Sequence, residues 1–502
     1  MLRPFRHLPA LLCAGLLFAR PAAAQGPDAA APDLAIAPST QVLRLRSDLR
    51  SILHAPRWRD ARFGVLVVSL DRGDTLFALE PDAPLEPASN LKLYTTAAAL
   101  YYLGPAYRFS TLLLAGGPVR DGVLEGDLVL YGTGDPTISG RMLESTTSTF
   151  RAFADTLAAL GVHEVRGNVV GDGSYFTGER LGAGWLPADL DEWYAAPISG
   201  LDYAENMVTV RVSGSAVGER AGVTTVPATR GLALENRVRT VRRGSTRIHF
   251  ERAEDRLIVS GQIRRGRVVV RSLPVVGPAN YAAAGLRAVL EEHGIEVTGS
   301  VRTITDPAES PMRPGAVPPR IVATHLSPTL AEIVSVTNHV SHNLFAEALL
   351  RAAGRAAAGA GSVDGGARAV RALLALAPGA DTTALHQVDG SGLSTLDHTT
   401  PGNTVALLEY LSGTGDRDAY LASLPRAGNE HGLRRMYDSA AAGNLRAKTG
   451  TIHGVSALSG YVTTADGEHL VFSIMANGVP STAREKASED AIGARLAEFS
   501  RR

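Results

Sequence analysis

The two ends of this chain carry complementary strand and helix patterns, and these constrain its fold more than any other feature. Near the N-terminus, the apolar run 63–70 predicts a buried strand, and residues 75–79 predict its returning partner after a short turn. Near the C-terminus, three strand-like runs joined by short turns precede a helix predicted at 484–499; the runs are 444–450, 455–462 and 469–476. We expect one sheet built from both ends, in a discontinuous domain of residues 25–108 and 320–502.

The middle of the chain has a different pattern. Short strand-like runs alternate with Gly-rich turns, at 124–134, 165–173, 208–212, 248–262 and 268–273. One amphipathic helix is clear at 280–293, and the Pro-rich stretch 307–319 reads as a linker. The fold class predicted is therefore α/β (α+β) with a large, mostly β insertion. We expect an inserted domain II at 109–205 plus 270–319, with a small, Arg-rich β domain III at 206–269 nested within it.

The first 24 residues have the features of a cleavable signal peptide. Arg3 and Arg6 precede an apolar stretch at 8–19, and three alanines at 22–24 suit cleavage. A membrane anchor is the weaker alternative, because a spanning helix needs about 20 apolar residues. We expect export to a periplasmic or extracytoplasmic location, with at most peripheral membrane association. The only cysteine, Cys13, lies in this segment, so the mature chain would have no disulfide or cysteine–metal site.

The chain has balanced charge but very few lysines. The 502 residues include 50 basic and 50 acidic side chains without a long basic run, which argues against a nucleic-acid partner. Only three of the basic residues are lysines, namely Lys92, Lys448 and Lys486. Arginine stays protonated in proteins, whereas a desolvated lysine can become a neutral base.

Two of these lysines lie in short motifs. Ser89 and Lys92 form an S-x-x-K motif near the start of a helix predicted at 86–104, so their side chains share one face. A serine hydroxyl is a poor nucleophile unless a base takes its proton, and Lys92 can do so if burial and a second cation lower its pKa. Backbone N–H groups at this helix start, including that of Ser89, would stabilise an oxyanion.

The other two motifs would complete such a site. Ser341 and Asn343 lie two apart in a helical stretch at 330–354, so they need a helix end or a local loop to face one site. Ser341 would pass a proton to a leaving amine, and Asn343 would hold Lys92 or a substrate amide. In the K-T-G motif, Lys448 and Gly450 face the same side of a strand. Thr449 and Thr451 offer hydroxyls to a substrate carboxylate, and Gly450 permits close approach of a peptide.

Each motif alone has a simpler explanation: a helix N-cap for Ser89, a solvated strand lysine for Lys448, and chance for S-x-N. Their joint occurrence in this order favours chemistry. Other hydrolase patterns are missing from the sequence. There is no G-x-S-x-G motif, and the zinc-peptidase pattern begun by His163 and Glu164 fails because Gly167 occupies the position of its second histidine.

The ordered motifs S-x-x-K, S-x-N and K-T-G resemble those of penicillin-binding proteins and serine β-lactamases. Four further stretches narrow the resemblance to class C low-molecular-mass penicillin-binding proteins, the D-Ala-D-Ala carboxypeptidases and endopeptidases of peptidase family S13: GDPT at 134–137, GNVVGDGSYF at 167–176, GWLPADLDEWYAAP at 184–197 and DGSGLS at 389–394. The long gap between Ser89 and Ser341 agrees with the large insertion of that family. The resemblance implies a penicillin-binding-protein/serine β-lactamase-like transpeptidase domain.

The resemblance also implies roles for residues. Ser89 would be the nucleophile and Lys92 its base, with Ser341, Asn343 and Lys448 completing the catalytic set. The substrate-binding residues implied are Thr449, Gly450, Thr451, Asp189 and Ser391. The substrates would be peptidoglycan stem peptides, β-lactams would inhibit covalently, and neither a metal nor a cofactor is implied.

Three positions depart from the family pattern: His342 where aspartate is usual, Thr395 where some relatives have arginine, and His453 in place of glutamine. Specificity for the third stem residue therefore stays open, as do oligomeric state and the balance of carboxypeptidase and endopeptidase action. Two alternatives remain, a catalytically idle peptidoglycan-binding scaffold and a β-lactamase.

Overall fold

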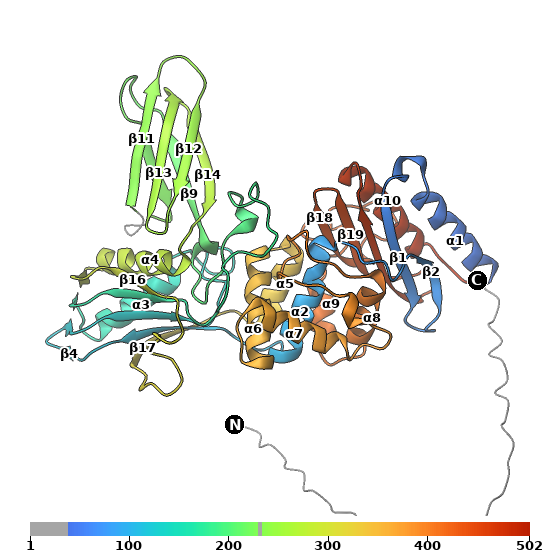
Figure 1. Cartoon of the computed structure of the whole chain (residues 1–502), viewed down its shortest axis with the longest axis horizontal. Coiled ribbons are helices and arrows are strands. Elements are labelled where there is room, and N and C mark those ends of the chain that lie inside the picture. The colour runs from blue at the N-terminus through green and yellow to red at the C-terminus, as the bar shows by residue number, and fades with distance from the viewer. Residues whose placement is uncertain (1–38, 229–232) are drawn as a thin grey trace, which may run out of the picture. The chain divides into compact units, whose positions relative to one another are not determined.

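The computed structural model describes residues 39–228 and 233–502, so the predicted signal peptide and Cys13 lie outside the described residues. A five-stranded antiparallel sheet joins the two ends of the chain, as the sequence predicted (Figure 1). Its strand order is β18-β19-β20-β1-β2, with bounds β1 (Arg62–Ser69), β2 (Thr75–Leu79), β18 (Arg446–Ile452), β19 (Val455–Thr463) and β20 (His469–Asn477).

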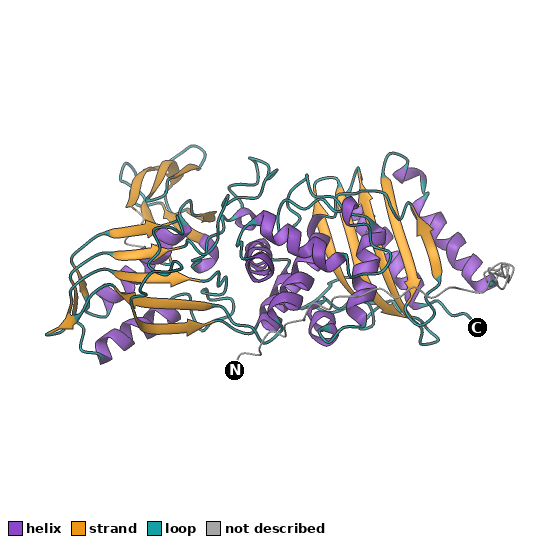
Figure 2. Cartoon of the chain, turned by 60° about the horizontal axis from the view of Figure 1, so that its bottom comes forward, coloured by secondary structure: helices purple, strands orange, loops and turns teal. Residues whose placement is uncertain are grey.

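Helices cover both faces of this sheet, which explains why β1 is apolar on both sides (Figure 2). Val65 and Val67 pack with α1 (Thr40–Leu53) and α10 (Thr482–Ala497), whereas Val68 packs with the helices of the opposite face. The helices of that opposite side are α2 (Lys92–Leu103), α5 (Leu330–Val340), α6 (Asn343–Ala358), α7 (Val363–Leu374), α8 (Pro401–Ser412) and α9 (Arg417–Ser423).

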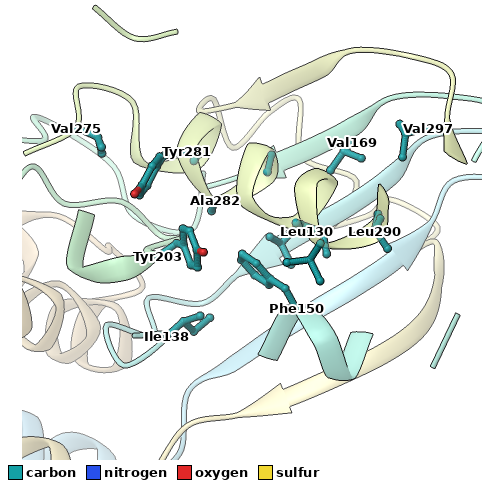
Figure 3. Packing of buried hydrophobic residues seen from close by; sticks show 14 of the residues in the cluster. Leu130, Ile138, Phe150, Val169, Tyr203, Val275, Tyr281, Ala282, Leu290 and Val297 are labelled. Atoms are coloured by element: carbon teal, nitrogen blue, oxygen red, sulfur yellow. The ribbon is translucent and has the colours of Figure 1, made fainter. Parts of the chain in front are cut away.

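The segment between β2 and α5 contains all the other strands of the described residues. A five-stranded mixed sheet has the order β16-β8-β6-β3-β17, with bounds β3 (Ser110–Ala115), β6 (Leu128–Gly132), β8 (Val169–Asp172), β16 (Val301–Ile304) and β17 (Arg320–Leu326). A small sheet beside it is formed by β4 (Val119–Arg120), β5 (Val123–Leu124), β7 (Glu164–Val165) and β15 (Glu296–Val297). Helices α3 (Ser148–Ala159) and α4 (Pro278–Glu292) pack against each other and against the mixed sheet, and bury Phe150 and Leu290 in one apolar core (Figure 3).

Two three-stranded sheets form the Arg-rich part of this segment. One has the order β10-β9-β14, and the other has the order β11-β13-β12. Their inner faces share the apolar residues Val210, Val212, Val259 and Ile263. The bounds are β9 (Met207–Ser213), β10 (Gly222–Val226), β11 (Ala233–Val241), β12 (Arg247–Arg252), β13 (Arg256–Arg264) and β14 (Val268–Pro274).

The structure corrects four local expectations. The runs 124–134 and 165–173 are not single strands, because each divides into two strands that join different sheets, β5 and β6 in the first and β7 and β8 in the second. The single strand predicted at 248–262 is wrong, because the polar residues Glu254 and Asp255 form a turn between β12 and β13. The run expected to be one helical stretch, 330–354, is two helices, α5 and α6, that meet at Ser341. The break between α5 and α6 supplies the helix end that the spacing of Ser341 and Asn343 required.

Candidate active site

Ser89 lies in a short 3-10 helix, η2 (Ala88–Leu91), that leads directly into α2. Ala88 has a positive φ of 46°, so the chain turns sharply just before the serine. Ser89 stays half-buried while its neighbours Asn90 and Leu91 are fully buried. The turn thus leaves the Ser89 side chain partly open to solvent at the start of a buried helix.

Lys92 is the centre of the site. Its Nζ donates to Ser89 Oγ at 2.9 Å, to Asn343 Oδ1 at 2.7 Å and to the Ser391 carbonyl at 2.7 Å. The side chain is fully buried, with 0% exposure. Three acceptors from three distant parts of the sequence therefore fix the amine beside the serine hydroxyl.

Burial lowers the pKa of Lys92 to about 7. Three buried carboxylic acids, Asp389, Glu347 and Asp397, oppose this shift. Their combined effect is smaller than that of burial, which is the largest cause of the shift. A substantial fraction of Lys92 is therefore a neutral amine at neutral pH, as a base for Ser89 requires.

The S-x-N motif occupies the junction of α5 and α6. Ser341 has left-handed backbone angles (φ 60°, ψ 41°) and ends α5, and Asn343 is the first residue of α6. The amide of Asn343 bridges two parts of the protein, since its Oδ1 accepts from Lys92 and its Nδ2 donates to the Tyr194 carbonyl at 2.8 Å. The break between the helices thus turns both motif side chains toward the lysines.

Lys448 is the second fully buried lysine of the site. Its Nζ donates to Ser341 Oγ at 2.9 Å and to the Thr449 carbonyl at 2.8 Å. Burial, together with the charge of Lys92, lowers the pKa of Lys448 well below its ordinary value. The charge of Lys92 therefore acts on Lys448, whereas burial is what lowers the pKa of Lys92, and each lysine bonds a different motif serine.

Gly450 lets strand β18 approach η2 closely. A Cβ atom at this position would lie 2.6 Å from the Pro87 carbonyl oxygen and 3.1 Å from the backbone nitrogens of Ser89 and Asn90. Thr449 beside it is half-buried and Thr451 is exposed. The K-T-G strand and the Ser89 turn are thus in direct backbone contact.

The predicted substrate-binding residues Asp189 and Ser391 occupy different surroundings. Asp189 is half-buried and accepts a hydrogen bond from the Tyr194 hydroxyl at 2.9 Å. Burial, and next this hydrogen bond, raise the pKa of Tyr194 to about 12. Ser391 is fully buried, and its carbonyl, not its hydroxyl, contacts Lys92. Thr395, at the position that departs from relatives, is exposed.

A buried carboxylate organises the loop around Ser391. Asp389 accepts from the backbone N–H groups of Ser391, Gly392 and Ser394 at 2.6–2.9 Å, and from Trp185 Nε1 at 2.8 Å. These four donors satisfy a carboxylate that is 0% exposed. Sequence reasoning missed Asp389 and Trp185 as partners; the only signal was an aspartate followed by a Gly/Ser-rich turn, which suits side-chain bonding to nearby backbone.

Residues 39–228 and 233–502 contain neither a membrane-spanning helix nor a cluster of metal-binding side chains. No helix in these ranges is long and apolar enough to span a bilayer. Within the same ranges, no group of three or more His, Cys, Asp or Glu side chains is arranged to hold a metal ion.

The chain is similar over most of its length to a known family of proteins. The model of the D-Ala-D-Ala carboxypeptidase 3 (S13) family matches residues 45–499. A D-alanyl-D-alanine carboxypeptidase of Actinomadura sp. (strain R39) is 37% identical over 487 residues, which are 94% of this chain and 87% of that protein. The D-alanyl-D-alanine carboxypeptidase DacB of Haemophilus influenzae is 26% identical, with 78% of this chain and 80% of that protein covered.

A solved structure shares the fold. Penicillin binding protein 4 (dacB) from Haemophilus influenzae superposes with a TM-score of 0.75 at 24% sequence identity, covering 90% of this chain and 98% of that one. The expected fold class, a penicillin-binding-protein-like α+β chain, is thereby confirmed. With a family match over most of its length and a relative at 37% identity, the chain belongs to the D-Ala-D-Ala carboxypeptidase 3 (S13) family.

Proposed function

We propose that this protein is a serine D-Ala-D-Ala carboxypeptidase that hydrolyses peptidoglycan stem peptides through an acyl-enzyme on Ser89. The observation that carries the proposal is the buried Lys92 amine, 2.9 Å from Ser89 Oγ, whose pKa burial lowers to about 7. A hydroxyl becomes an effective nucleophile when a base within hydrogen-bond reach accepts its proton. Family membership agrees with this chemistry.

In the first half-reaction, Ser89 Oγ bonds to the carbonyl carbon of the penultimate D-Ala while its proton passes to neutral Lys92. The backbone N–H groups of Ser89 and Thr451 would stabilise the oxyanion, which the close contact of η2 and β18 at Gly450 supports. The tetrahedral intermediate then collapses, and the C–N bond breaks. The departing amine takes up the proton that Lys92 received, relayed through Ser341, which Lys448 bonds at 2.9 Å, so Lys92 is neutral again.

In the second half-reaction, water attacks the Ser89 ester and gives up a proton to the same base. The product acid leaves and the Ser89 hydroxyl is restored. Lys448 and the hydroxyls of Thr449 and Thr451 would hold the terminal carboxylate of the substrate, since all three belong to the strand that faces the Ser89 turn. Asp189 would contact the stem-peptide side chain, with Tyr194 orienting its carboxylate.

The proposal includes a domain division and a location. The catalytic domain would comprise residues 25–108 and 320–502, with domain II at 109–205 plus 270–319 and domain III at 206–269. The separate sheets support this division in outline but not at two of its bounds. Strand β17 (320–326) pairs with β3 of domain II, and β14 (268–274) pairs with β9 of domain III, so each of these two domains would extend slightly further along the chain. The pattern of residues 1–24 supports export by a cleavable signal peptide to a periplasmic or extracytoplasmic location.

Release of D-alanine from a peptide ending in D-Ala–D-Ala tests the proposal, with Ser89→Ala as the inactive control. Cleavage of a cross-linked muropeptide dimer in parallel measures endopeptidase action. Fast turnover of penicillin without D-alanine release would instead favour a β-lactamase. A folded wild type that neither releases D-alanine nor reacts with penicillin would favour an idle scaffold.

A further inference from the structure

His342, the middle residue of the S-x-N motif, is buried at a contact with the inserted region. Its Nε2 lies 3.0 Å from Glu205 Oε2, and its ring packs against Phe345 and the edge of Trp193. Its sequence neighbours Ser341 and Asn343 bond the two buried lysines. The His342 side chain therefore bonds the inserted region alone, whereas Ser341 bonds a lysine and Asn343 bonds both a lysine and the Tyr194 carbonyl of the inserted region.

The partner carboxylate is itself held firmly. Arg141 donates to both oxygens of Glu205, at 2.7 and 2.9 Å, and Ser139 Oγ adds a third donor at 3.2 Å. The bonds from His342 and Arg141 lower the pKa of Glu205 to about 2 against the opposing effect of burial. Glu205 is therefore a carboxylate throughout the neutral range.

The backbone that carries Glu205 is strained and anchored. Ala204, Glu205 and Asn206 all have left-handed angles, with φ between 53° and 56°, which residues other than glycine seldom adopt. Tyr203, which precedes this segment, and Ile138, whose carbonyl accepts from the Ala204 N–H at 2.8 Å, are both buried in the core of the inserted region (Figure 3). A strained conformation persists only where its surroundings fix it, so Glu205 presents its carboxylate from a rigid support.

The charge state of His342 follows from its contacts. Nδ1 is buried and has no hydrogen-bond partner among the described residues, so protonating it would leave a buried donor unpaired. The positive charges of Arg141 and Lys92 also oppose protonation, and only Glu205 favours it. Burial is the largest cause of the lowered pKa of His342. The imidazole is thus neutral at neutral pH and donates its Nε2–H to Glu205.

We propose that His342 is a positioning residue: its hydrogen bond to Glu205 clamps the turn between α5 and α6 to the inserted region and so aligns Ser341 and Asn343. Within the turn itself, the backbone N–H groups of Ser341 and His342 both donate to the Thr337 carbonyl, which ties the turn to α5 but not to the inserted region. The clamp on His342 and the bond from Asn343 to the Tyr194 carbonyl fix it from the inserted side. This inference rests on the proposed acyl transfer at Ser89.

The test compares His342→Leu with His342→Gln. Glutamine places an amide N–H near the position of imidazole Nε2, whereas leucine removes the donor. We expect His342→Leu to lower kcat for D-alanine release roughly tenfold to a hundredfold, as loss of a hydrogen bond to a charged group implies, with KM changed less than about threefold. His342→Gln should recover most of kcat. The rate of D-alanine release is divided by the amount of protein that fluorescent penicillin labels, so that unfolded molecules do not lower the measured kcat.

Two controls separate this proposal from others. His293→Leu removes another histidine–carboxylate contact of the inserted region, with Asp155 at 3.6 Å, and should leave kcat unchanged. In a Glu205→Leu background, adding His342→Leu should lower kcat little further, because the hydrogen bond between His342 and Glu205 is already lost. Unchanged kcat in His342→Leu, or equal losses in the leucine and glutamine variants, would overturn the proposal. A wild type without D-alanine release would instead refute the proposed function.

Discussion

Lys92 has opposing influences on its charge, and their balance determines the chemistry at Ser89. Burial favours the neutral amine, while Asp389 favours the ammonium. Asp389 in turn accepts four hydrogen bonds, three from backbone N–H groups and one from Trp185, and none of them comes from Lys92. The lysine is thus a base whose pKa lies near the pH at which it must act.

The second-order rate of acylation by penicillin should therefore fall as the pH drops below about 7. Below its pKa, Lys92 is protonated, and each further pH unit removes about nine-tenths of the neutral base. A pH–rate profile of the wild type measures this. An acylation rate that stays constant from pH 7 down to about pH 5 would contradict the prediction.

Replacing the base tests the same point without changing the pH. Lys92→Arg should lower the acylation rate by about 10²–10⁴-fold, because a guanidinium does not deprotonate. Lys486, the lysine outside the site, provides the control: Lys486→Arg should react like the wild type. A Lys92→Arg variant with an unchanged rate would refute the role of the amine.

The elements show what a sequence can predict and what it cannot. The strands at both ends of the chain were predicted, because apolar runs between turn residues are local signals. Helix α1 was missed, although Leu45, Leu49 and Leu53 have helical spacing. The three motifs were found by order and residue type, whereas the bond between Trp185 and Asp389 joins residues 204 positions apart and has no local signal.

Strand β18 and η2 pack so closely at Gly450 that one added methyl group would push them apart. Gly450→Ala would place Cβ 2.6 Å from the Pro87 carbonyl oxygen, so the Ser89 turn must shift. We expect acylation to slow at least about tenfold and stability to fall by about 1–3 kcal/mol. Gly415→Ala is the matched control, since no atom lies within 4 Å of its added Cβ. Thermal melts and acylation rates measure both effects, and an unaffected Gly450→Ala variant would contradict the packing.

At the scale of the molecule, the inserted region contributes hydrogen bonds to the loops and turns of the site. Trp185 bonds Asp389, the Tyr194 carbonyl bonds Asn343, and the Ala183 carbonyl accepts from Ser394 Oγ at 2.6 Å. Each bond reaches a loop or turn that holds Lys92 or a motif residue. The insertion therefore stabilises the geometry of the site and does not serve only as a separate module.

Removing one such bond should cost stability. Trp185→Phe deletes the indole N–H and leaves Asp389 with three backbone donors, a loss of about 1.5–3 kcal/mol in the free energy of unfolding. Trp58→Phe removes a similar volume, but Trp58 Nε1 has no hydrogen-bond partner within the described chain, so it controls for the smaller ring. Denaturant unfolding of both variants gives the difference, and equal losses would show that the bond to Asp389 contributes nothing.

The central claim is that Ser89 is acylated, and intact-protein mass spectrometry after incubation with penicillin tests it most directly. We expect one covalent adduct on the wild type, none on Ser89→Ala, and an adduct on Ser391→Ala, because Ser391 bonds Lys92 through its backbone carbonyl. An adduct that persists on Ser89→Ala, or a folded wild type that forms none, would contradict it.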